Sequence, residues 1–293
     1  MSSSLGYFLE NPFIFRDIRC IIATIKAKGG THMKYGFIGC GNMGGALARA
    51  LAKTTKDIII SDPSTWAEEL AAQLDCEYGC NDQAAQCDRV FLAVKPNILE
   101  SVLSGIRPIL KTHKPLLISM AAGVSIESIE AFAGTELPVI RIMPNTPAAV
   151  GKGMITYCCN DLVDEDTVED FLGDMCMAGY FDRLDEKLME AATAVAGCGP
   201  AYLYMMIEAM ADGAVACGLP RAKAQLYAAM TVSGAAEMVL KSGQHPGALK
   251  DAVCSPGGST IAGVQTLEQH GFRGAVMDCI VDAYEKTKAL GKK

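Results

Sequence analysis

The sequence predicts an α/β protein in which a doubly wound, mostly parallel sheet is followed by an all-α domain. Apolar strand-like runs alternate with helix-like stretches up to about residue 187, which is typical of a parallel sheet covered by helices. Beyond residue 187 only helical patterns follow. A chain of 293 residues is long enough for the two domains that this change of pattern implies.

Composition and charge restrict the partners of the chain. Hydrophobic residues make up 50% of it, charged residues 20%, and the formal net charge is −7. A nucleic-acid surface needs a basic patch, and no run of basic residues occurs. The apolar run Cys20–Ile25 is far shorter than the roughly 20 residues that span a bilayer. We therefore expect a small-molecule ligand, no nucleic acid and no membrane.

The cysteines and histidines do not form a metal or disulfide pattern. The 12 cysteines are scattered singly, apart from Cys158 and Cys159, and no cleavable signal pattern precedes them. This distribution favours reduced thiols in the cytoplasm over a disulfide framework. No C-x-x-C pair and no H-x-x-x-H spacing occurs, so we expect no metal site.

Residues 1–32 differ in character from the rest of the sequence. They mix aromatic residues, both signs of charge and the short apolar run. Glu10 and Asp17 argue against a transit peptide, because such peptides contain few acidic residues. We interpret residues 1–32 as an extension from a tag or an early start codon, ahead of a true beginning at Met33.

A glycine-rich turn follows the first strand after Met33 and precedes an amphipathic helix. Its residues are Gly39, Cys40, Gly41, Asn42, Met43 and Gly44. The G-x-G-x-x-G pattern in this context is typical of a Rossmann-type domain. There Gly39 allows the tight turn, Gly41 lets the backbone approach a pyrophosphate, and Gly44 lets the helix pack on the strand. The alternative is a glycine-rich turn without a ligand.

Asp62 ends the second strand, about 20 residues after the glycines. An acid at this place can hydrogen-bond the two hydroxyls of an adenosine ribose and would repel a 2′-phosphate. Pro63, Ser64 and Thr65 follow, so no arginine stands beside Asp62 to accept that phosphate. This feature favours NADH over NADPH. The alternative is that Asp62 caps the turn before a helix that begins at Pro63.

Four further strands are expected at 90–94, 116–120, 138–143 and 153–158. Ala93 and Val94 end the first of these, and Lys95 and Pro96 follow at the carboxyl edge, where open α/β sheets bind ligands. We expect Pro96 to open a helix. Lys95 either faces the cofactor or only caps the edge of the sheet.

Long helices rich in alanine and methionine are expected at 201–218, 223–242 and 274–290. They are apolar around much of their circumference, and a helix that is apolar on more than one face must be buried by something. Roughly 100 residues cannot bury all of these faces internally. We therefore predict a helical domain that intertwines with a second subunit. The alternative is that the helices simply cover the first domain.

The stretch DAVCSPGGSTIAG, residues 251–263, interrupts the helical pattern with a proline, glycines and small polar residues. Pro256, Gly257 and Gly258 would expose backbone N–H groups at the N-terminus of the next helix, an anion site that needs no basic side chain. Ser255 can add a hydroxyl donor. From the residues alone, an ordinary loop and helix N-cap explain the stretch equally well.

Six motifs together resemble the Δ1-pyrroline-5-carboxylate reductase family. They are IGCGNMGGAL (38–47), LAVKP (92–96), SMAAGVSIESIE (119–130), RIMPNTPAAVGKG (141–153), AGCGPAY (196–202) and LKDAVCSPGGSTIAG (249–263). They occur in family order, and the last is the most specific. The resemblance implies a Rossmann domain, residues 33–187, and a helical dimerisation domain, residues 188–293. The latter would interlock two subunits as a homodimer, and larger assemblies of dimers, such as rings, are common in the family.

The resemblance also implies roles for individual residues. Those expected to cradle the substrate carboxylate are Ser255, Pro256, Gly257, Gly258, Ser259 and Thr260. Thr260 is expected to act as the catalytic residue by hydrogen-bonding the ring nitrogen. Asn81 corresponds to an asparagine near the adenosine ribose. The residues that correspond to loops at the nicotinamide edge are Met120, Ala121, Ala122 and Asn145.

The implied reaction is hydride transfer from NADH or NADPH to the C=N bond of Δ1-pyrroline-5-carboxylate, which gives L-proline. A protonated imine is already a good electrophile, so the enzyme mainly has to hold the ring against the nicotinamide. One alternative is a dehydrogenase of the 6-phosphogluconate or β-hydroxyacid type, which would need a catalytic lysine, whereas Lys223, Lys241 and Lys250 fall on polar faces or turns. Another is a non-catalytic dinucleotide-binding regulator.

Overall fold

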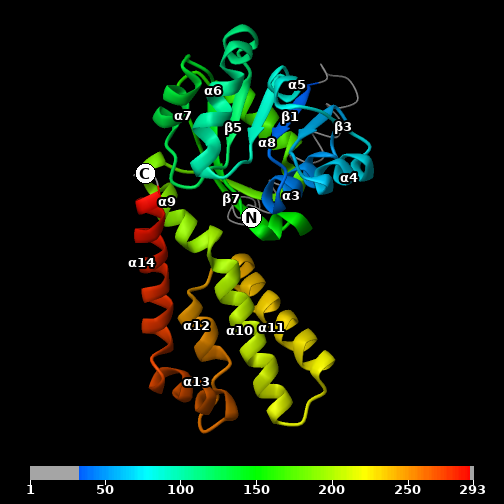
Figure 1. The fold of residues 1–293 in the computed structure, drawn as a ribbon. Helices are drawn as coiled ribbons and strands as arrows, with labels where there is room; N and C mark the ends of the chain where they lie inside the picture. The colour runs from blue at the N-terminus through cyan, green and yellow to red at the C-terminus, as the bar shows by residue number, and fades with distance from the viewer. Residues whose placement is uncertain (1–32, 291–293) are drawn as a thin grey trace, which may run out of the picture. The chain divides into compact units, whose positions relative to one another are not determined.

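The computed structural model describes residues 33–290, so the expected extension at residues 1–32 lies outside the described residues. The chain divides into two compact units (Figure 1). Among the described residues, the first consists of 33–197 together with 284–290, and the second is Cys198–Ala283. No helix within residues 33–290 is both long enough and apolar enough to cross a membrane.

An eight-stranded sheet forms the centre of the first unit, in the order β3-β2-β1-β4-β5-β6-β7-β8. The strands are β1 (Tyr35–Ile38), β2 (Ile58–Ser61), β3 (Glu77–Tyr78), β4 (Arg89–Leu92), β5 (Leu116–Ser119), β6 (Val139–Met143), β7 (Gly153–Cys159) and β8 (Gly179–Arg183). β1 to β6 run parallel, β7 is antiparallel to β6, and β8 is parallel to β7. The mostly parallel, doubly wound sheet is confirmed, and its 3-2-1-4-5-6 order is that of a Rossmann domain.

Two strands were not expected from the sequence. β3 has only two residues, and both are exposed, so it carries no apolar signal. β8 reads GYFDR, in which polar residues interrupt the apolar ones at the edge of the sheet. β3 and β8 are the two edge strands of the sheet, so each pairs with a neighbouring strand on one side only. Edge strands of this kind are fixed by pairing with the sheet and not by their own pattern.

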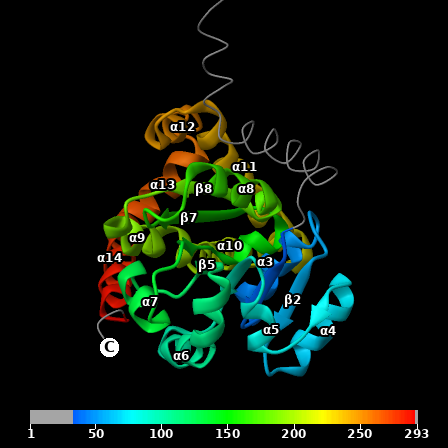
Figure 2. The same ribbon diagram turned by 90° about the horizontal axis from the view of Figure 1, so that it is seen from above.

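Helices cover both faces of the sheet (Figure 2). They are α3 (Asn42–Leu51), α4 (Thr65–Leu74), α5 (Asn81–Ala85), α6 (Pro96–His113), α7 (Ile126–Ala133), α8 (Glu165–Asp174) and α9 (Met189–Ala192), with the short turns η1 (Thr146–Val150), η2 (Cys176–Ala178), η3 (Glu186–Leu188) and the π-helical turn η4 (Thr193–Gly197). On one face the stacked rings of Phe37 and Phe91, with centroids 4.3 Å apart, pack with Leu47 and Phe171. On the other, Leu92 packs with residues of α6 and α7.

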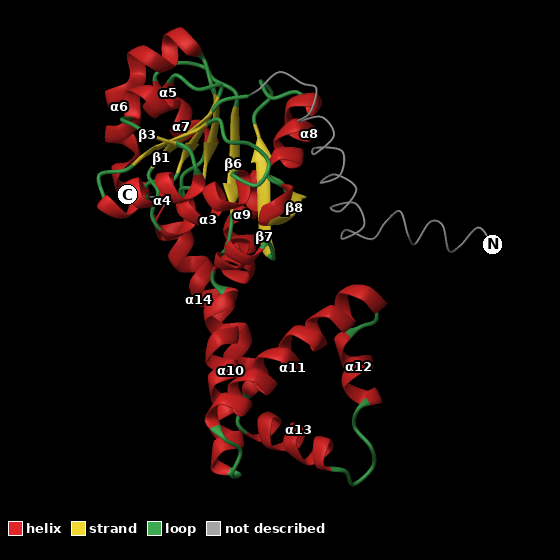
Figure 3. Cartoon of the chain, turned by 90° about the vertical axis from the view of Figure 1, so that its right-hand side faces the viewer, coloured by secondary structure: helices red, strands yellow, loops and turns green. Residues whose placement is uncertain are grey.

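The second unit is entirely helical and contains α10 (Gly199–Ala216), α11 (Arg221–Ser242), α12 (Pro246–Ala252), α13 (Ser259–Gln269) and most of α14 (Phe272–Leu290). The three long helices that the sequence predicts are therefore present. α10 and α11 pack as a hairpin (Figure 3). The buried residues of this unit are Ala211, Ala224 and Ala228, all within that hairpin.

Large apolar side chains of the second unit lie exposed. Met205 is 70% exposed, Met230 65% and Met277 63%. They lie on α10, α11 and α14, and further exposed leucine, methionine and tyrosine residues surround them in the sequence. Within the described chain, these apolar faces therefore have no cover.

The segment Glu186–Gly197 packs with the first unit, although we expected the domain boundary at residue 187. Arg141 on β6 forms ion pairs with Glu186 and Glu190. The Asn145 side chain donates a hydrogen bond to the carbonyl of Ala196, 2.9 Å away. These bonds fasten the segment to the sheet, and the compact units accordingly divide at Gly197.

Candidate active site

The glycine-rich turn lies where the strand order of the sheet reverses, between β1 and its neighbours β2 and β4. Gly39 has φ +88°, and a Cβ there would lie 2.7 Å from the carbonyl oxygen of Ala93. A Cβ at Gly44 would lie 2.8 Å from the carbonyl oxygen of Gly39. Both positions therefore require glycine, the first for the turn and the second for packing of α3. Ligands of open α/β sheets bind at this reversal point.

Gly41 faces open space, and it is also the N-cap of α3. A Cβ at Gly41 would have no atom within 4 Å. No side chain caps the helix, and its first turn has no acidic residue. Asn42 is exposed and Met43 half-buried. The free N–H groups and the helix dipole therefore suit a pyrophosphate, so the residues present fit a dinucleotide.

Cys40 is a packing residue of this turn. It is fully buried, and burial together with the nearby charge of Asp62 raises the pKa of its thiol to about 12. The thiol is therefore neutral and unreactive at physiological pH.

Asp62 holds the glycine turn through its side chain. Oδ2 accepts a hydrogen bond from the backbone N–H of Cys40 at 2.7 Å, and Oδ1 accepts bonds from the N–H and hydroxyl of Ser64. Partial burial raises the pKa of Asp62, but the bonds from Ser64 and Cys40 outweigh it and lower the pKa below its ordinary value. A charged carboxylate thus stands at the carboxyl end of β2, beside the turn.

The helix after Asp62 begins later than expected. α4 starts at Thr65 with Ser64 as its N-cap, so the helix start at Pro63, which the capping alternative for Asp62 assumed, is wrong. The two bonds from Ser64 to Asp62 close a tight turn that contains Pro63, and this turn delays the helix by two positions. Asp62 therefore bonds both the N-cap residue of α4 and the glycine turn, but it is not itself the cap of the helix.

Asn81 lies next to the end of β2. It opens α5, and the hydroxyl of Ser61 donates to its Oδ1 at 2.6 Å. The hydroxyl of Tyr78 donates to the carbonyl of Asp62 at 2.8 Å. Asp62, Tyr78 and Asn81 therefore line one edge of the sheet at β2 and β3, which is consistent with an adenosine site.

The loop after β4 packs against the glycine turn. The N–H of Ala93 donates to the carbonyl of Ile38 at 2.8 Å, and the Val94 side chain approaches Gly39. Pro96 opens α6 as expected, because a helix needs no N–H at its first position. Lys95 is the N-cap residue, but its exposed side chain makes no capping bond. Within residues 33–290, the Lys95 side chain is available for a ligand.

The loop after β5 and Asn145 lie at the same edge of the sheet. The N–H of Met120 donates to the carbonyl of Leu92 at 3.2 Å, Ala121 is buried, and Ala122 is half-buried. Asn145 is buried, and besides its bond to Ala196 its Oδ1 accepts from the N–H of Met154 at 3.0 Å. The Asn145 amide thus joins backbone segments, and its contact with a nicotinamide stays a prediction.

In the second unit, Ser255–Gly258 form a type II turn directly before α13. The N–H of Gly258 donates to the carbonyl of Ser255 at 3.0 Å, and Gly257 has φ +69° in the third position of the turn. The expectation that Gly258 exposes its N–H is therefore wrong, because the turn uses that group. Pro256 suits the second position and has no N–H of its own.

The N–H groups available at this helix start belong to Ser259, Thr260 and Ile261. Gly258 is the N-cap, no side chain caps α13, and its first turn has no acidic residue. Ser255, Ser259 and Thr260 are exposed. The arrangement suits a carboxylate, with the Thr260 hydroxyl one position inside the helix.

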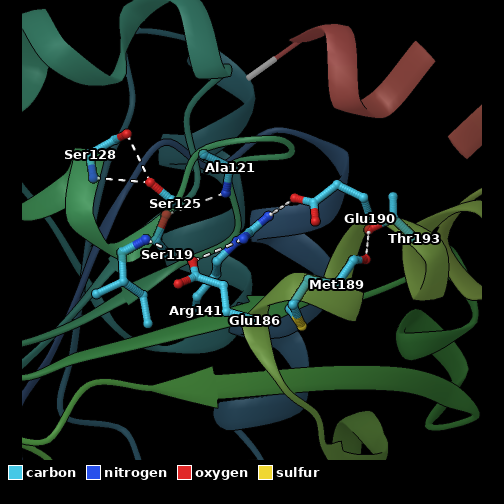
Figure 4. Close-up of polar contacts among 10 residues, drawn as sticks. Ser119, Ala121, Ser125, Ser128, Arg141, Glu186, Met189, Glu190 and Thr193 are labelled. Carbon is cyan, nitrogen blue, oxygen red and sulfur yellow. Dashed lines mark hydrogen bonds and ion pairs between the residues drawn. The ribbon is translucent and has the colours of Figure 1, made fainter. Parts of the chain in front are cut away.

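Sequence reasoning missed one polar cluster, which lies around the middle residue of β6. Arg141 is only 2% exposed and contacts Glu186 and Glu190 (Figure 4). The available signal was the single arginine in the otherwise apolar strand Val139–Met143. Its partners lie more than 40 residues later in the chain, so spacing alone did not indicate them.

Known proteins are similar to this chain in sequence and in fold. A family model described as pyrroline-5-carboxylate reductase dimerisation matches residues 186–290, and one described as NADP oxidoreductase, coenzyme F420-dependent, matches residues 34–123. The pyrroline-5-carboxylate reductase of Escherichia coli is 42% identical over 269 residues, which cover 88% of this chain and 98% of that protein. The chain belongs to the pyrroline-5-carboxylate reductase family.

Solved structures agree with the family. The pyrroline carboxylate reductase of Plasmodium falciparum, a structure with NADP bound, has a TM-score of 0.81 and 37% identity, covering 89% of this chain and 98% of that one. The Streptococcus pyogenes enzyme has a TM-score of 0.81 and 36% identity, covering 88% and 98%. The expected Rossmann-type sheet followed by a helical dimerisation region is confirmed.

Proposed function

We propose that this chain reduces Δ1-pyrroline-5-carboxylate to L-proline with NADH or NADPH, the last step of proline biosynthesis. The observation that carries the proposal is the open start of α13, where a type II turn leads into an uncapped helix. This place suits the carboxylate of a small substrate. Curated relatives at 36% to 42% identity carry the name of this reductase.

The dinucleotide is assigned to the carboxyl edge of the sheet in the first unit. The N-terminus of α3 would bind the pyrophosphate, because it has no side-chain cap and the backbone at Gly41 is open. Asp62 and Asn81 bind the adenosine ribose. Ala93–Pro96, Met120–Ala122 and Asn145 would hold the nicotinamide half.

When bound, the reduced nicotinamide supplies a hydride for the C=N carbon. The N–H groups of Ser259, Thr260 and Ile261 bind the substrate carboxylate, and Ser255 adds a hydroxyl donor. The Thr260 hydroxyl holds the ring nitrogen and the proton on it. One hydride at carbon and one proton at nitrogen convert the C=N bond to the amine. Rate then depends on holding the reacting atoms about 3–3.5 Å apart.

We also propose that the helical region, residues 188–293, forms a homodimer that is the minimum active assembly, while residues 33–187 form the dinucleotide-binding domain. The exposed apolar faces of α10, α11 and α14 support this, because a monomer would leave them in water. The scattered single cysteines favour a cytoplasmic location.

The test is the oxidation of NADH and, separately, NADPH at equal concentrations with racemic Δ1-pyrroline-5-carboxylate, together with detection of proline. Proline formation with NADH preferred supports the reaction and the assignment of Asp62. Proline formation with NADPH preferred keeps the reaction and removes the argument from Asp62. Absence of turnover with either dinucleotide contradicts the proposal, and dinucleotide binding without turnover would indicate a regulator.

A further inference from the structure

Arg141 is a charged side chain in the interior of the sheet. Alternation along β6 puts it on the same face as Val139 and Met143, which belong to the apolar core of that face. Its neighbours in register are Ser119 on β5 and Cys158 on β7. A buried charge is costly unless it is paired, so the pairing of Arg141 decides what it does.

Each terminal nitrogen of Arg141 binds a different carboxylate (Figure 4). Nη1 lies 3.0 Å from Oε1 of Glu186, and Nη2 lies 2.7 Å from Oε1 of Glu190. Nε is buried and has no hydrogen-bond partner within residues 33–290. The planar guanidinium thus spans two carboxylates on η3 and α9, a geometry that a single ammonium group cannot reproduce.

Glu186 connects Arg141 to the loop after β5. Its Oε1 also accepts the backbone N–H of Ile126, the first residue of α7, at 2.8 Å. Ser125 caps the same helix by accepting the N–H of Ser128 at 3.2 Å. The loop Met120–Ser125 is therefore fixed at its far end by Glu186, and its near end follows β5 directly.

Glu190 connects Arg141 to the segment Glu186–Gly197, which precedes α10 in the chain and is called the connector here. Within the connector the hydroxyl of Thr193 donates to the carbonyl of Met189 at 2.7 Å. Asn145 binds the carbonyl of Ala196, so β6 and the residues after it hold the connector at two places.

We propose that Arg141 is a positioning residue of the reductase: through Glu186 it fixes the loop Met120–Ser125, and through Glu190 it fixes the connector. Arg141 itself touches neither substrate nor cofactor. The inference rests on the proposed function, in which Met120–Ala122 line the nicotinamide. Since well-packed apolar residues often stabilise a protein as well as a buried ion cluster does, what this cluster adds is a defined geometry.

The test compares Arg141→Met, Arg141→Lys and the triple variant Arg141→Met, Glu186→Gln, Glu190→Gln, which leaves none of the three positions charged. The matched control is Arg89→Met, which removes a second buried arginine of the same sheet. Arg89 is the first residue of β4, and its Nη1 lies 3.0 Å from Oδ2 of Asp174. For each folded variant, kcat, the KM for pyrroline-5-carboxylate, the Kd for NADH, the thermal midpoint and amide exchange at residues 120–126 are measured.

A positioning role predicts that kcat of Arg141→Met falls on the order of 100-fold, because small misplacement of reacting groups costs this much. The Kd for NADH changes less than about threefold, since β1 and β2 hold the pyrophosphate and adenosine. The kcat of Arg141→Lys lies between those of the wild type and Arg141→Met. The triple variant regains thermal stability relative to Arg141→Met but does not regain kcat. The backbone amides of residues 120–126 exchange faster in Arg141→Met than in the wild type. Arg89→Met loses stability and keeps kcat.

Wild-type kcat in any of the folded Arg141 variants overturns the inference, and so does an equal fall of kcat in Arg89→Met. If the wild type itself does not turn over, the proposed function fails, and amide exchange then decides the structural part. Unchanged exchange at residues 120–126 in Arg141→Met would mean that Arg141 does not fix the loop.

Discussion

The two compact units differ in how they bury their apolar residues. In the first, the central strands are buried on both faces, and aromatic rings and aliphatic side chains fill the layers above and below the sheet. In the second, only three alanines are buried, while methionines of α10, α11 and α14 are exposed. The first unit therefore owes its stability to its own core, whereas the second leaves apolar faces exposed that the proposed homodimer would bury.

The same difference separates the glycine turn of the first unit from the turn before α13 in the second. The dinucleotide turn is tightly packed, since a Cβ at Gly39 would collide with the loop after β4. The turn before α13 is open, and a Cβ at Gly257 would have no atom within 4 Å. The glycine turn of the first unit is thus held by close packing, whereas the turn before α13 in the second unit is not packed against other residues of its surroundings.

The largest expected effect comes from charging the exposed apolar faces. Met205→Glu combined with Met230→Glu changes side chains that are 70% and 65% exposed, so an isolated chain loses little stability. In a dimer these carboxylates would be buried without partners, which costs several kcal/mol. We expect a monomer by light scattering and a fall in kcat of about 100-fold or more.

The control for this change is Leu162→Glu, which charges a side chain of the first unit that is 54% exposed. It should leave both the assembly state and kcat unchanged. A double variant on α10 and α11 that stays dimeric with wild-type kcat would contradict the comparison between the two units.

The next effect concerns the two turns with positive φ. Gly39→Ala combines left-handed strain with a collision at 2.7 Å, so we expect the free energy of unfolding to fall by about 2–5 kcal/mol and NADH binding to be lost. Gly257→Ala carries only the strain, about 1–2 kcal/mol. Urea unfolding followed by the fluorescence of Trp66, the single tryptophan, reports on the first unit and should respond to Gly39→Ala alone. A similar response of Trp66 to both substitutions would mean that the two units unfold together and would contradict the comparison between them.

Thr260→Ala tests the open half of the site. We expect kcat to fall about 100-fold while the Kd for NADH is unchanged, because a hydroxyl at the ring nitrogen matters only during reduction. The matched control is Thr266→Ala on the same helix, whose hydroxyl bonds the carbonyl of Ala262 within the helix. Equal losses in kcat and NADH affinity would count against the assignment of Thr260.

The smallest effect concerns dinucleotide preference. Asp62→Asn removes the charge that opposes a 2′-phosphate, and we expect the ratio of kcat/KM for NADH over NADPH to fall about tenfold. Since hydrogen bonds from Ser64 and Cys40 lower the pKa of Asp62, its carboxylate stays charged at neutral and alkaline pH, and the wild-type ratio should be constant between about pH 7 and 9. Asp75→Asn at the opposite end of α4 is the control. An unchanged ratio in Asp62→Asn would remove the argument from charge.

Local patterns determined much of what could be predicted. The glycine turn, the strand β2, the helix start at Pro96 and the long helices α10, α11 and α14 follow from the spacing of apolar residues and from glycine and proline chemistry. The sequence also predicted that these three helices carry apolar faces that need cover, because the apolar residues around a helix can be read from its own sequence.

Only the tertiary structure decided the rest. The edge strands β3 and β8 exist because a neighbouring strand pairs with them, and the start of α4 moved to Thr65 because Ser64 bonds Asp62. Gly258 gives its N–H to Ser255 because of the φ of Gly257. The ion pairs of Arg141 join β6 to residues more than 40 positions later. Sequence patterns encode the preference of each segment, whereas such contacts depend on the register of strands that the folded sheet alone brings together.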